Sequence, residues 1–592
     1  MYSFIPSWYG DRGEWQGSIL PWHEAGCSYE FDDTVNHLRM FRDAGEETEI
    51  LCLGWSPRLR RFLHRQSLER IACWSVFDEL QGITLQKPAV FSYLELPWPE
   101  NVEWVYMPTH LAAYCGNQHY ADVEFAGDGT LCWVDYYADG YPARRDIYDD
   151  RGFCSSSVFY QRGKLLRQEY YDQDGRLRFT WEHGSGEDGP NLVIAKCHAV
   201  EKTGAYETAA NEAVVNGTGF IQIAKDAEAD FAKSVYSSME ELIGERLIRY
   251  LSASPDREAI VIAANTRHDS LVRGALESLP KQRIVMSFFE DRFDLQDEKA
   301  VLEDTQNASL IVTDTEHAAR QIREAGVQDI PICDISPFDV RLPLGKSQQI
   351  RELKIFMPLD GLEGVLLEKA LQQLFAYMRT NQDAVLLAGT RASTYSEQER
   401  LQEKLNEVLL SMSEPGLQGI SLSERQAQDP GIPPSKQQAQ GAVDSSLEQY
   451  APRMDVPPAT EQTREQEGGG GGEIAARIRV TPYHSETDLI RILRDARLIL
   501  DVRDQPELYL QIAGISAGIP QVNYRFTRYV KHKKDGYIIQ NINYITGALE
   551  YYLDSLSGWN EALVYCVQEV SEYTGGTLVQ RWKRMLDEAA QG

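Results

Sequence analysis

The chain has 592 residues, enough for two to four domains, and a formal net charge of −30. Such an acidic surface repels nucleic-acid phosphates and anionic lipids, which excludes nonspecific nucleic-acid binding. Nine cysteines are scattered without a C-x-x-C pair, which indicates a reducing compartment rather than a disulfide framework or a thiolate zinc site.

The first residues lack a basic, apolar leader, and no apolar run reaches the roughly 18 residues of a membrane span. We therefore expect a cytoplasmic protein. No H-E-x-x-H or comparable cluster occurs among the 11 histidines, so we expect neither a metal nor a cofactor.

The N-terminal segment predicts an α/β domain. Tyr2–Ile5 and 49–55 have the composition of buried strands, and the helix between them begins at Asp32 or Asp33 and ends at Gly45. The order strand, helix, strand is typical of a parallel sheet, in which loops at the carboxyl ends of the strands line a cleft.

The stretch from 120 to 183 predicts an antiparallel meander, because turn signals recur every 11 or 12 residues between strand-like runs. The turns are centred on Gly129, Gly140, Gly152, Gly163 and Gly175. Large rings on both faces of 131–137 leave two interpretations open, a sheet that covers a core or a surface for a partner protein. The period is too short for a four-stranded propeller blade.

Strands and helices then alternate in two series, which predicts two parallel sheets. We expect a GT-B-like fold of two Rossmann-type domains, with an extended antiparallel meander inserted in the first. The expected units are 1–95 with 215–350, the inserted sheet at 96–214, the second domain at 351–560, and a C-terminal helix at 561–592. A polar stretch at 413–472, rich in proline and glutamine and ending in five glycines, predicts a disordered insertion.

Two basic clusters stand out against the acidic background. One lies on a helix after the second strand and contains Arg58, Arg60, Arg61 and Arg65. It fits either an ion-paired face or the docking of an acidic partner. The other follows a late strand and contains Arg525, Arg528, Lys531, Lys533 and Lys534. It fits a solvated loop, an anionic ligand or the inner membrane surface.

Two sequence patterns resemble catalytic motifs but lack features that those motifs need. The G-x-S-x-G pattern around Ser516 needs a strand, a sharp turn and then a helix, whereas here a helix at 507–517 precedes a strand at 520–524. The sequence Gly345-Lys346-Ser347 ends like a phosphate-binding loop, but Val340 stands where that loop needs its first glycine.

Specific segments carry a family resemblance. These are Phe4-Ile5-Pro6-Ser7-Trp8-Tyr9, the run 31–41, Arg61-Phe62-Leu63-His64-Arg65-Gln66, the turn 148–153 and Ser238-Met239-Glu240-Glu241-Leu242-Ile243. They resemble the first of the three accessory secretory proteins of the Gram-positive accessory Sec system, over nearly the whole chain outside the insertion. The resemblance implies a GT-B-like cytoplasmic protein. Its implied partners are the second and third accessory secretory proteins, the accessory SecA ATPase and a serine-rich glycoprotein substrate.

The resemblance to retaining GT-B enzymes also implies two glutamates, eight positions apart, that hold the donor sugar and its nucleotide. Counted back from Pro520, these places fall on Gln505 and Ala513, while Glu507 lies two positions out of register. A site built to bind hydroxyls loses discrimination when its polar partners go, so we expect a noncatalytic protein. The alternative is an active transferase that modifies serine or threonine of a serine-rich protein.

For the noncatalytic interpretation, we expect the cleft to bind an extended peptide or its sugars, because aromatic rings suit sugar faces. The expected binding residues are Trp8, Tyr9 and Trp15 from the first domain and Arg391, Gln505 and Glu507 from the second. The same tryptophans would also fit simple packing of the long loop.

Overall fold

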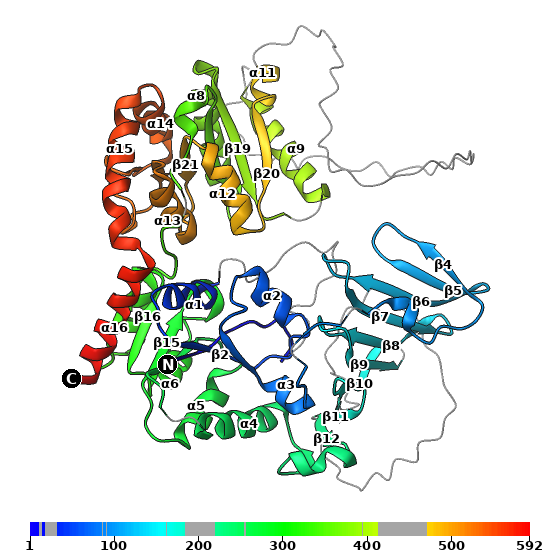
Figure 1. The fold of residues 1–592 in the computed structure, drawn as a ribbon. Coiled ribbons are helices and arrows are strands. Elements are labelled where there is room, and N and C mark those ends of the chain that lie inside the picture. The colour runs from blue at the N-terminus through cyan, green and yellow to red at the C-terminus, as the bar shows by residue number, and fades with distance from the viewer. Residues whose placement is uncertain are drawn as a thin grey trace, which may run out of the picture.

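The computed structural model describes residues 1–592 except 11–14, 18–31, 86, 90, 162, 184–218, 254–255, 342, 393–394, 413–470 and 592. Three sheets organise the described residues into a first lobe, a meander beside it and a second lobe above it (Figure 1). The expected insertion at 413–472 lies outside the described residues, apart from its last two glycines. So does most of the segment between 182 and 219.

The first lobe is built on a seven-stranded parallel sheet in the order β17-β16-β15-β14-β1-β2-β3. Its strands are β1 Tyr2–Ile5, β2 Thr48–Cys52, β3 Ala72–Ser75, β14 Ala259–Ala263, β15 Ile284–Phe288, β16 Leu310–Thr313 and β17 Ile332–Asp334. Most of these strands are buried on both faces, as continuous apolar runs require.

Helices cover both faces of this sheet. They are α1 Asp33–Asp43, α2 Leu59–Arg65, α3 Val76–Gln81, α4 Met239–Ala253, α5 Asp269–Glu277, α6 Glu298–Thr305 and α7 Glu316–Glu324. The expected limits of α1 are confirmed: the side chain of Asp32 accepts a hydrogen bond from the backbone N–H of Val35 at 3.0 Å, and Gly45 leaves the helix with φ of 81°.

The meander is a ten-stranded antiparallel sheet in the order β13-β12-β11-β10-β9-β8-β7-β6-β5-β4. Its strands are β4 Val102–Tyr106, β5 Leu111–Cys115, β6 Gln118–Phe125, β7 Leu131–Ala138, β8 Tyr141–Tyr148, β9 Cys154–Gln161, β10 Lys164–Tyr171, β11 Leu177–Glu182, β12 Phe220–Ile223 and β13 Val235–Tyr236. All five predicted turn glycines have positive φ. The sheet continues past the expected boundary at 214, because β12 pairs with β11 across the segment that is not described.

The meander shares a core with the first lobe. Trp55 packs edge-on against Tyr170 at 5.5 Å between ring centroids, and Phe77 and Phe179 belong to the same buried cluster. The arginines of α2 bind acidic groups of this chain: Arg58 and Arg61 pair with Asp128 of the meander, and Arg60 pairs with Asp78. The ion-paired interpretation of this helix is therefore confirmed. The acidic partner of Arg58 and Arg61 is Asp128, which lies in the chain's own meander.

The second lobe has a six-stranded parallel sheet in the order β20-β19-β18-β21-β22-β23. Its strands are β18 Leu353–Pro358, β19 Ala384–Thr390, β20 Ile478–Pro482, β21 Leu498–Asp501, β22 Gln521–Asn523 and β23 Gly536–Ile538. Its helices are α8 Gly364–Thr380, α9 Tyr395–Ser411, α11 Gly471–Ala475, α12 Glu486–Asp495, α13 Leu508–Ala517 and α14 Ile545–Leu553. Helix α13 precedes β22, and Ser516 is buried within it, so this serine is not a nucleophile at a strand end.

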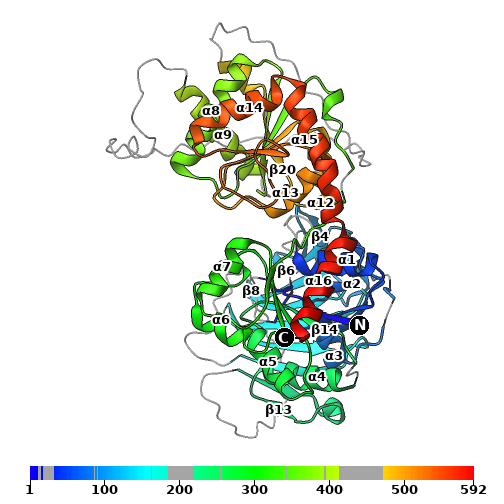
Figure 2. The ribbon, with the colours of Figure 1, turned by 90° about the vertical axis from the view of Figure 1, so that its left-hand side faces the viewer.

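The C-terminal segment forms two helices rather than the single helix expected from 561 to 592. Helix α15, Leu556–Glu569, stays on the second lobe, and α16, Gly575–Gln591, crosses onto α1 of the first lobe (Figure 2). Trp582 of α16 is 2% exposed and meets the ring of Phe41 at 5.8 Å. Within the described part of the chain, no helix is both long and apolar enough to cross a membrane.

Candidate functional site at the seam between the lobes

The loops that follow the carboxyl ends of both parallel sheets meet at a seam between the lobes. Arg39 of α1 donates to Glu486 of α12 at 3.0 Å, and the hydroxyl of Tyr509 donates to the other oxygen of Glu486 at 3.0 Å. The ring of Phe338, from the first lobe, packs edge-on against Tyr509 at 5.2 Å. The lobes are thus joined by a partly buried ion pair and an aromatic contact beside the strand ends.

Glu507 is the central acidic residue on the second-lobe side of the seam. Its side chain is 7% exposed, and one carboxylate oxygen accepts from Arg391 at 2.8 Å. The other oxygen accepts from Arg503 and from the hydroxyl of Tyr483, both at 3.3 Å. The position of Glu507 is fixed as well, since its backbone N–H donates to Asp501 at 3.0 Å.

The two guanidinium groups around Glu507 remain charged. Burial disfavours the charge of Arg503, but the fork of bonds to Asp501 at 2.7 and 2.9 Å, together with Glu507, outweighs burial and raises the pKa of Arg503. Burial likewise opposes the charge of Arg391, and Glu507 and Tyr483 outweigh it and raise the pKa of Arg391. The carboxylate of Glu507 is therefore held by the chain itself.

Glu290 faces this cluster from the first lobe. It follows β15 with φ of 47°, a left-handed conformation unusual for a residue with a side chain, and its backbone N–H donates to Asp314 at 2.8 Å. The protein packed around its carboxyl group raises the pKa of Glu290 to about 7. Arg391 lowers that pKa in part, while Glu507 and Asp314 raise it. Glu290 is nevertheless exposed to solvent at the seam.

A buried carboxylate pair lies behind Glu290. Burial favours the neutral form of Asp33, but Arg292, which donates to both of its oxygens at 2.7 and 3.1 Å, outweighs burial and lowers the pKa of Asp33 to about 2. Burial and the nearby charge of Asp33 raise the pKa of Asp32 to about 6. The N-terminus of α1 and the segment after β15 thus supply both charged and protonatable groups.

The expected aromatic residues lie in the interior. Trp8 is 3% exposed and donates its indole N–H to Asp32 at 3.0 Å. Trp15 is 3% exposed and donates to Glu240 at 2.7 Å. Tyr9 is half-buried, and its hydroxyl is 2.8 Å from Nδ1 of His268, whose pKa burial lowers to about 3. The expectation that both tryptophans line an open cleft is wrong, because Trp8 and Trp15 are buried in two hydrophobic clusters of the first lobe.

The three binding residues expected from the second lobe do not all lie together. Arg391 and Glu507 are brought together at the seam, whereas Gln505 is exposed in the loop between β21 and α13. Ala513, at the other expected glutamate position, is 3% exposed inside α13. No carboxylate stands at either position.

Sequence reasoning missed Glu290, Arg503 and Tyr483. The rule that strand ends line the site points to all three, since each follows a strand of a parallel sheet. Nothing in the sequence showed that the two lobes would bring Glu290 within the field of Arg391 and Glu507.

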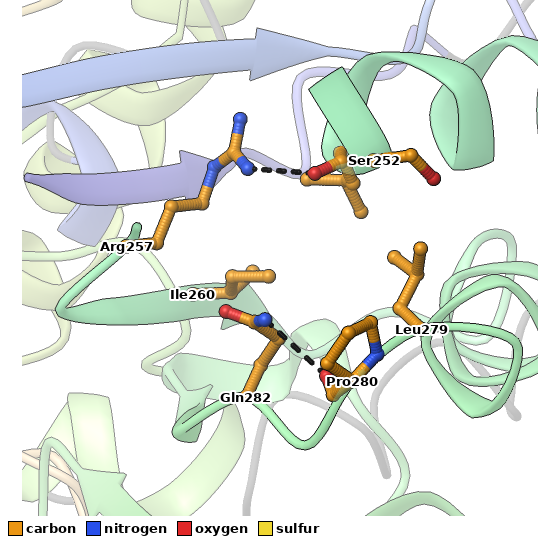
Figure 3. A pocket seen from close by; sticks show the side chains of 7 residues that line it. Ser252, Arg257, Ile260, Leu279, Pro280 and Gln282 are labelled. Atoms are coloured by element: carbon orange, nitrogen blue, oxygen red, sulfur yellow. Dashed lines mark hydrogen bonds between the residues drawn. The ribbon is translucent and has the colours of Figure 1, made fainter. Parts of the chain in front are cut away.

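A separate pocket of about 330 Å³ lies at the opposite, amino edge of the first-lobe sheet (Figure 3). Its polar side chains already have partners: Arg257 donates to the carbonyl of Leu251 at 3.1 Å, and Gln282 donates to that of Pro280 at 3.2 Å. We assign this pocket no ligand.

Two facing parallel-sheet lobes, an extended sheet inserted in the first, and a C-terminal helix that crosses back define a protein of the GT-B class. The pneumococcal O-GlcNAc transferase GtfA, solved with UDP and GlcNAc, shares this fold. It matches with a TM-score of 0.62 at 10% identity, over 100% of this chain and 99% of that one.

The family model that describes the first accessory secretory protein of the accessory Sec system matches residues 1–201, 204–419 and 434–589. A protein of that description from Streptococcus gordonii is 30% identical over 100% of this chain and 99% of its own length. The structure of accessory secretory proteins 1, 2 and 3 from Streptococcus pneumoniae contains a chain that matches with a TM-score of 0.75 at 25% identity, over the full length of both chains. The chain belongs to the family of the first accessory secretory protein of the accessory Sec system.

Proposed function

We propose that this chain is a noncatalytic subunit of the accessory Sec export machinery, and that its inter-lobe seam holds the exported substrate without reacting with it. The observation that carries the proposal is the state of Glu507, whose carboxylate is occupied by two guanidinium groups and a phenol of the same chain. A nucleotide sugar would have to displace these bonds to reach it. The two positions where a retaining enzyme would carry its glutamates hold Gln505 and Ala513.

The proposed partners follow from the relatives. The pneumococcal structure contains accessory secretory proteins 1, 2 and 3 together, and we propose the same assembly here. In this proposal the complex works in the cytoplasm with the accessory SecA ATPase in export of a serine-rich glycosylated adhesin. We also propose that the basic loop after β22 makes peripheral contact with the inner membrane surface. That loop carries Phe526, which is 73% exposed, beside Arg525.

An active transferase is the rival function, and the likeness of the fold to the O-GlcNAc transferase favours it. Titration calorimetry of the purified chain with UDP-GlcNAc separates the two. We expect no saturable heat for the natural chain at donor concentrations up to the roughly millimolar range in which enzymes bind substrates. Saturable binding that weakens in a Glu507→Gln variant and is unchanged in a Glu407→Gln control, on the exposed face of α9, would show a working donor site and favour the rival.

A further inference from the structure

The outer strand of the meander, β4, has a strand neighbour on only one side among the described residues, and its end is apolar and exposed. Strand β4 pairs with β5 on one side, and it ends the order of the ten-stranded sheet on the other. Figure 1 shows β4 at the tip of the meander, with no helix or strand of the described residues beyond it. The opposite edge is β13, only two residues long, which leaves little backbone for another strand to pair with.

Strand β4 has few of the devices that usually protect an edge, the charge of Glu103 apart. It contains no lysine or proline, and its register with β5 runs without a bulge from Val102 to Tyr106. Its end carries three consecutive exposed apolar side chains, Val105 at 43%, Tyr106 at 80% and Met107 at 47%, and Leu94 is exposed at 62% in the segment that precedes the strand. An unprotected apolar edge is suited to strand addition by another chain.

The backbone of this edge is oriented for such pairing. The N–H of Met107 donates to the carbonyl of His110 at 3.0 Å, so the residues bonded to β5 are Glu103 and Val105. In an antiparallel ladder the alternate residues turn their N–H and C=O groups to the other side. Trp104 and Tyr106 therefore present their backbone groups to the open edge.

Aromatic packing holds β4 in place without a partner. The ring of Trp104 meets Trp98 at 4.8 Å and Tyr93 at 5.1 Å, both edge-on, and the indole of Trp98 donates to the carbonyl of Tyr93 at 2.6 Å. Burial and the neighbouring side chain of Tyr106 raise the pKa of Tyr93. Because the edge is already ordered, a partner strand loses little affinity to ordering it.

The charge around this edge selects the partner. No lysine or arginine occurs between Lys87 and Arg144. The same stretch holds eight acidic residues, Glu95, Glu100, Glu103, Asp122, Glu124, Asp128, Asp135 and Asp139. Asp128 and Asp135 are paired with arginines from other parts of the chain. Glu103 lies on β4 itself and is exposed, so a basic segment is favoured over an acidic one.

We propose that β4 is a docking edge for an extended, basic segment of a partner polypeptide. The segment adds as an eleventh strand through Trp104 and Tyr106, with apolar side chains against Val105 and Tyr106 and a lysine or arginine near Glu103. The inference rests on the proposed function, in that this partner is one of the other two accessory secretory proteins.

Two variants test the edge while leaving the fold intact. Tyr106→Pro removes a backbone N–H that points away from β5, so the ladder to β5 keeps its bonds. Glu103→Lys reverses a charge on an exposed side chain. The matched controls are Val564→Lys, at an exposed position on α15 of the second lobe, and Glu407→Lys on α9. Equal melting temperatures of all four variants and the natural chain establish that the fold is retained.

The measurement is the affinity of the full chain for the second and third accessory secretory proteins, purified together and separately, by biolayer interferometry. We expect both edge variants to bind one of them at least roughly tenfold more weakly, with the controls unchanged. Hydrogen exchange of the complex should protect the amides of Trp104 and Tyr106, which exchange rapidly in the free chain.

The remaining outcomes overturn one proposal or the other. If the natural chain binds a partner and the edge variants bind it equally well, the docking edge is wrong while the proposed function stands. If the natural chain binds neither partner, the proposed assembly fails and the docking edge fails with it. If Tyr106→Pro instead abolishes a homodimer seen by sedimentation, the edge pairs with a second copy and the basic partner is wrong.

Discussion

Replacing Arg503 by glutamine tests whether the chain itself neutralises the carboxylates of the second lobe. The guanidinium of Arg503 is 14% exposed and lies between Asp501, 2% exposed, and Glu507, 7% exposed. Removing one partner of a buried ion pair costs about 3–5 kcal/mol, because the other charge stays buried. Arg503→Gln leaves Asp501 without its charged partner, so we expect a loss in this range.

The assay is thermal and urea unfolding of the full chain. The transition to be measured is the unfolding of the second lobe. For a lobe of this size each kcal/mol lowers Tm by about 2–4 °C, and Arg503→Lys, which keeps the charge, should lose less than Arg503→Gln. The control is Arg391→Gln, which removes a guanidinium that is 45% exposed and should cost less than Arg503→Gln, because Arg503 still pairs with Glu507. A loss for Arg503→Gln no larger than that of the control would refute the idea that this ion pair holds the site together.

Three further predictions concern other parts of the molecule. Trp582→Ala should weaken the docking of α16 by about 3–5 kcal/mol, seen as faster hydrogen exchange in α1 and α16. Gly152→Ala should destabilise the chain more than Gly129→Ala, in urea unfolding, because both have positive φ but only at Gly152 would a Cβ lie 2.4 Å from a backbone oxygen. Glu290 should titrate near pH 7 by NMR, and Glu507→Gln should lower that pKa, since it removes a negative charge and leaves Arg391 to favour the ionised form. An unchanged titration would mean that the lobes do not meet as described.

Periodic features could be predicted from the sequence because local chemistry determines them. The turn at Asp139-Gly140 has φ of 49° and 73°, the positive values that an Asp-Gly pair predicts. Helix α1 begins after Asp32 and stops at Gly45 because a cap and a left-handed glycine act within a few residues of the helix ends. The alternation of strands and helices likewise indicated both parallel sheets.

The candidate site was only partly predictable because its contacts span the chain. The ion pair between Arg391 and Glu507 joins residues 116 positions apart, and the field that Arg391 exerts at Glu290 crosses from one lobe to the other. For Trp8 and Trp15, the sequence predicted a binding role, and the structure places both residues in the interior. A tryptophan suits a sugar face and a hydrophobic core equally well. The hydrogen-bond partners of the two indoles, Asp32 and Glu240, lie elsewhere in the sequence.

We propose that this chain has kept the two lobes of a sugar-transferring scaffold while its own side chains occupy the second-lobe site. The most direct test mixes the purified complex of this chain and its two proposed partners with UDP-GlcNAc and a serine-rich acceptor peptide, and measures free UDP and the mass of the peptide. We predict release of UDP no faster than without protein, and a peptide of unchanged mass. Stoichiometric UDP release with a peptide heavier by one sugar, both lost in a Glu507→Gln variant, would show instead that the chain is an active transferase.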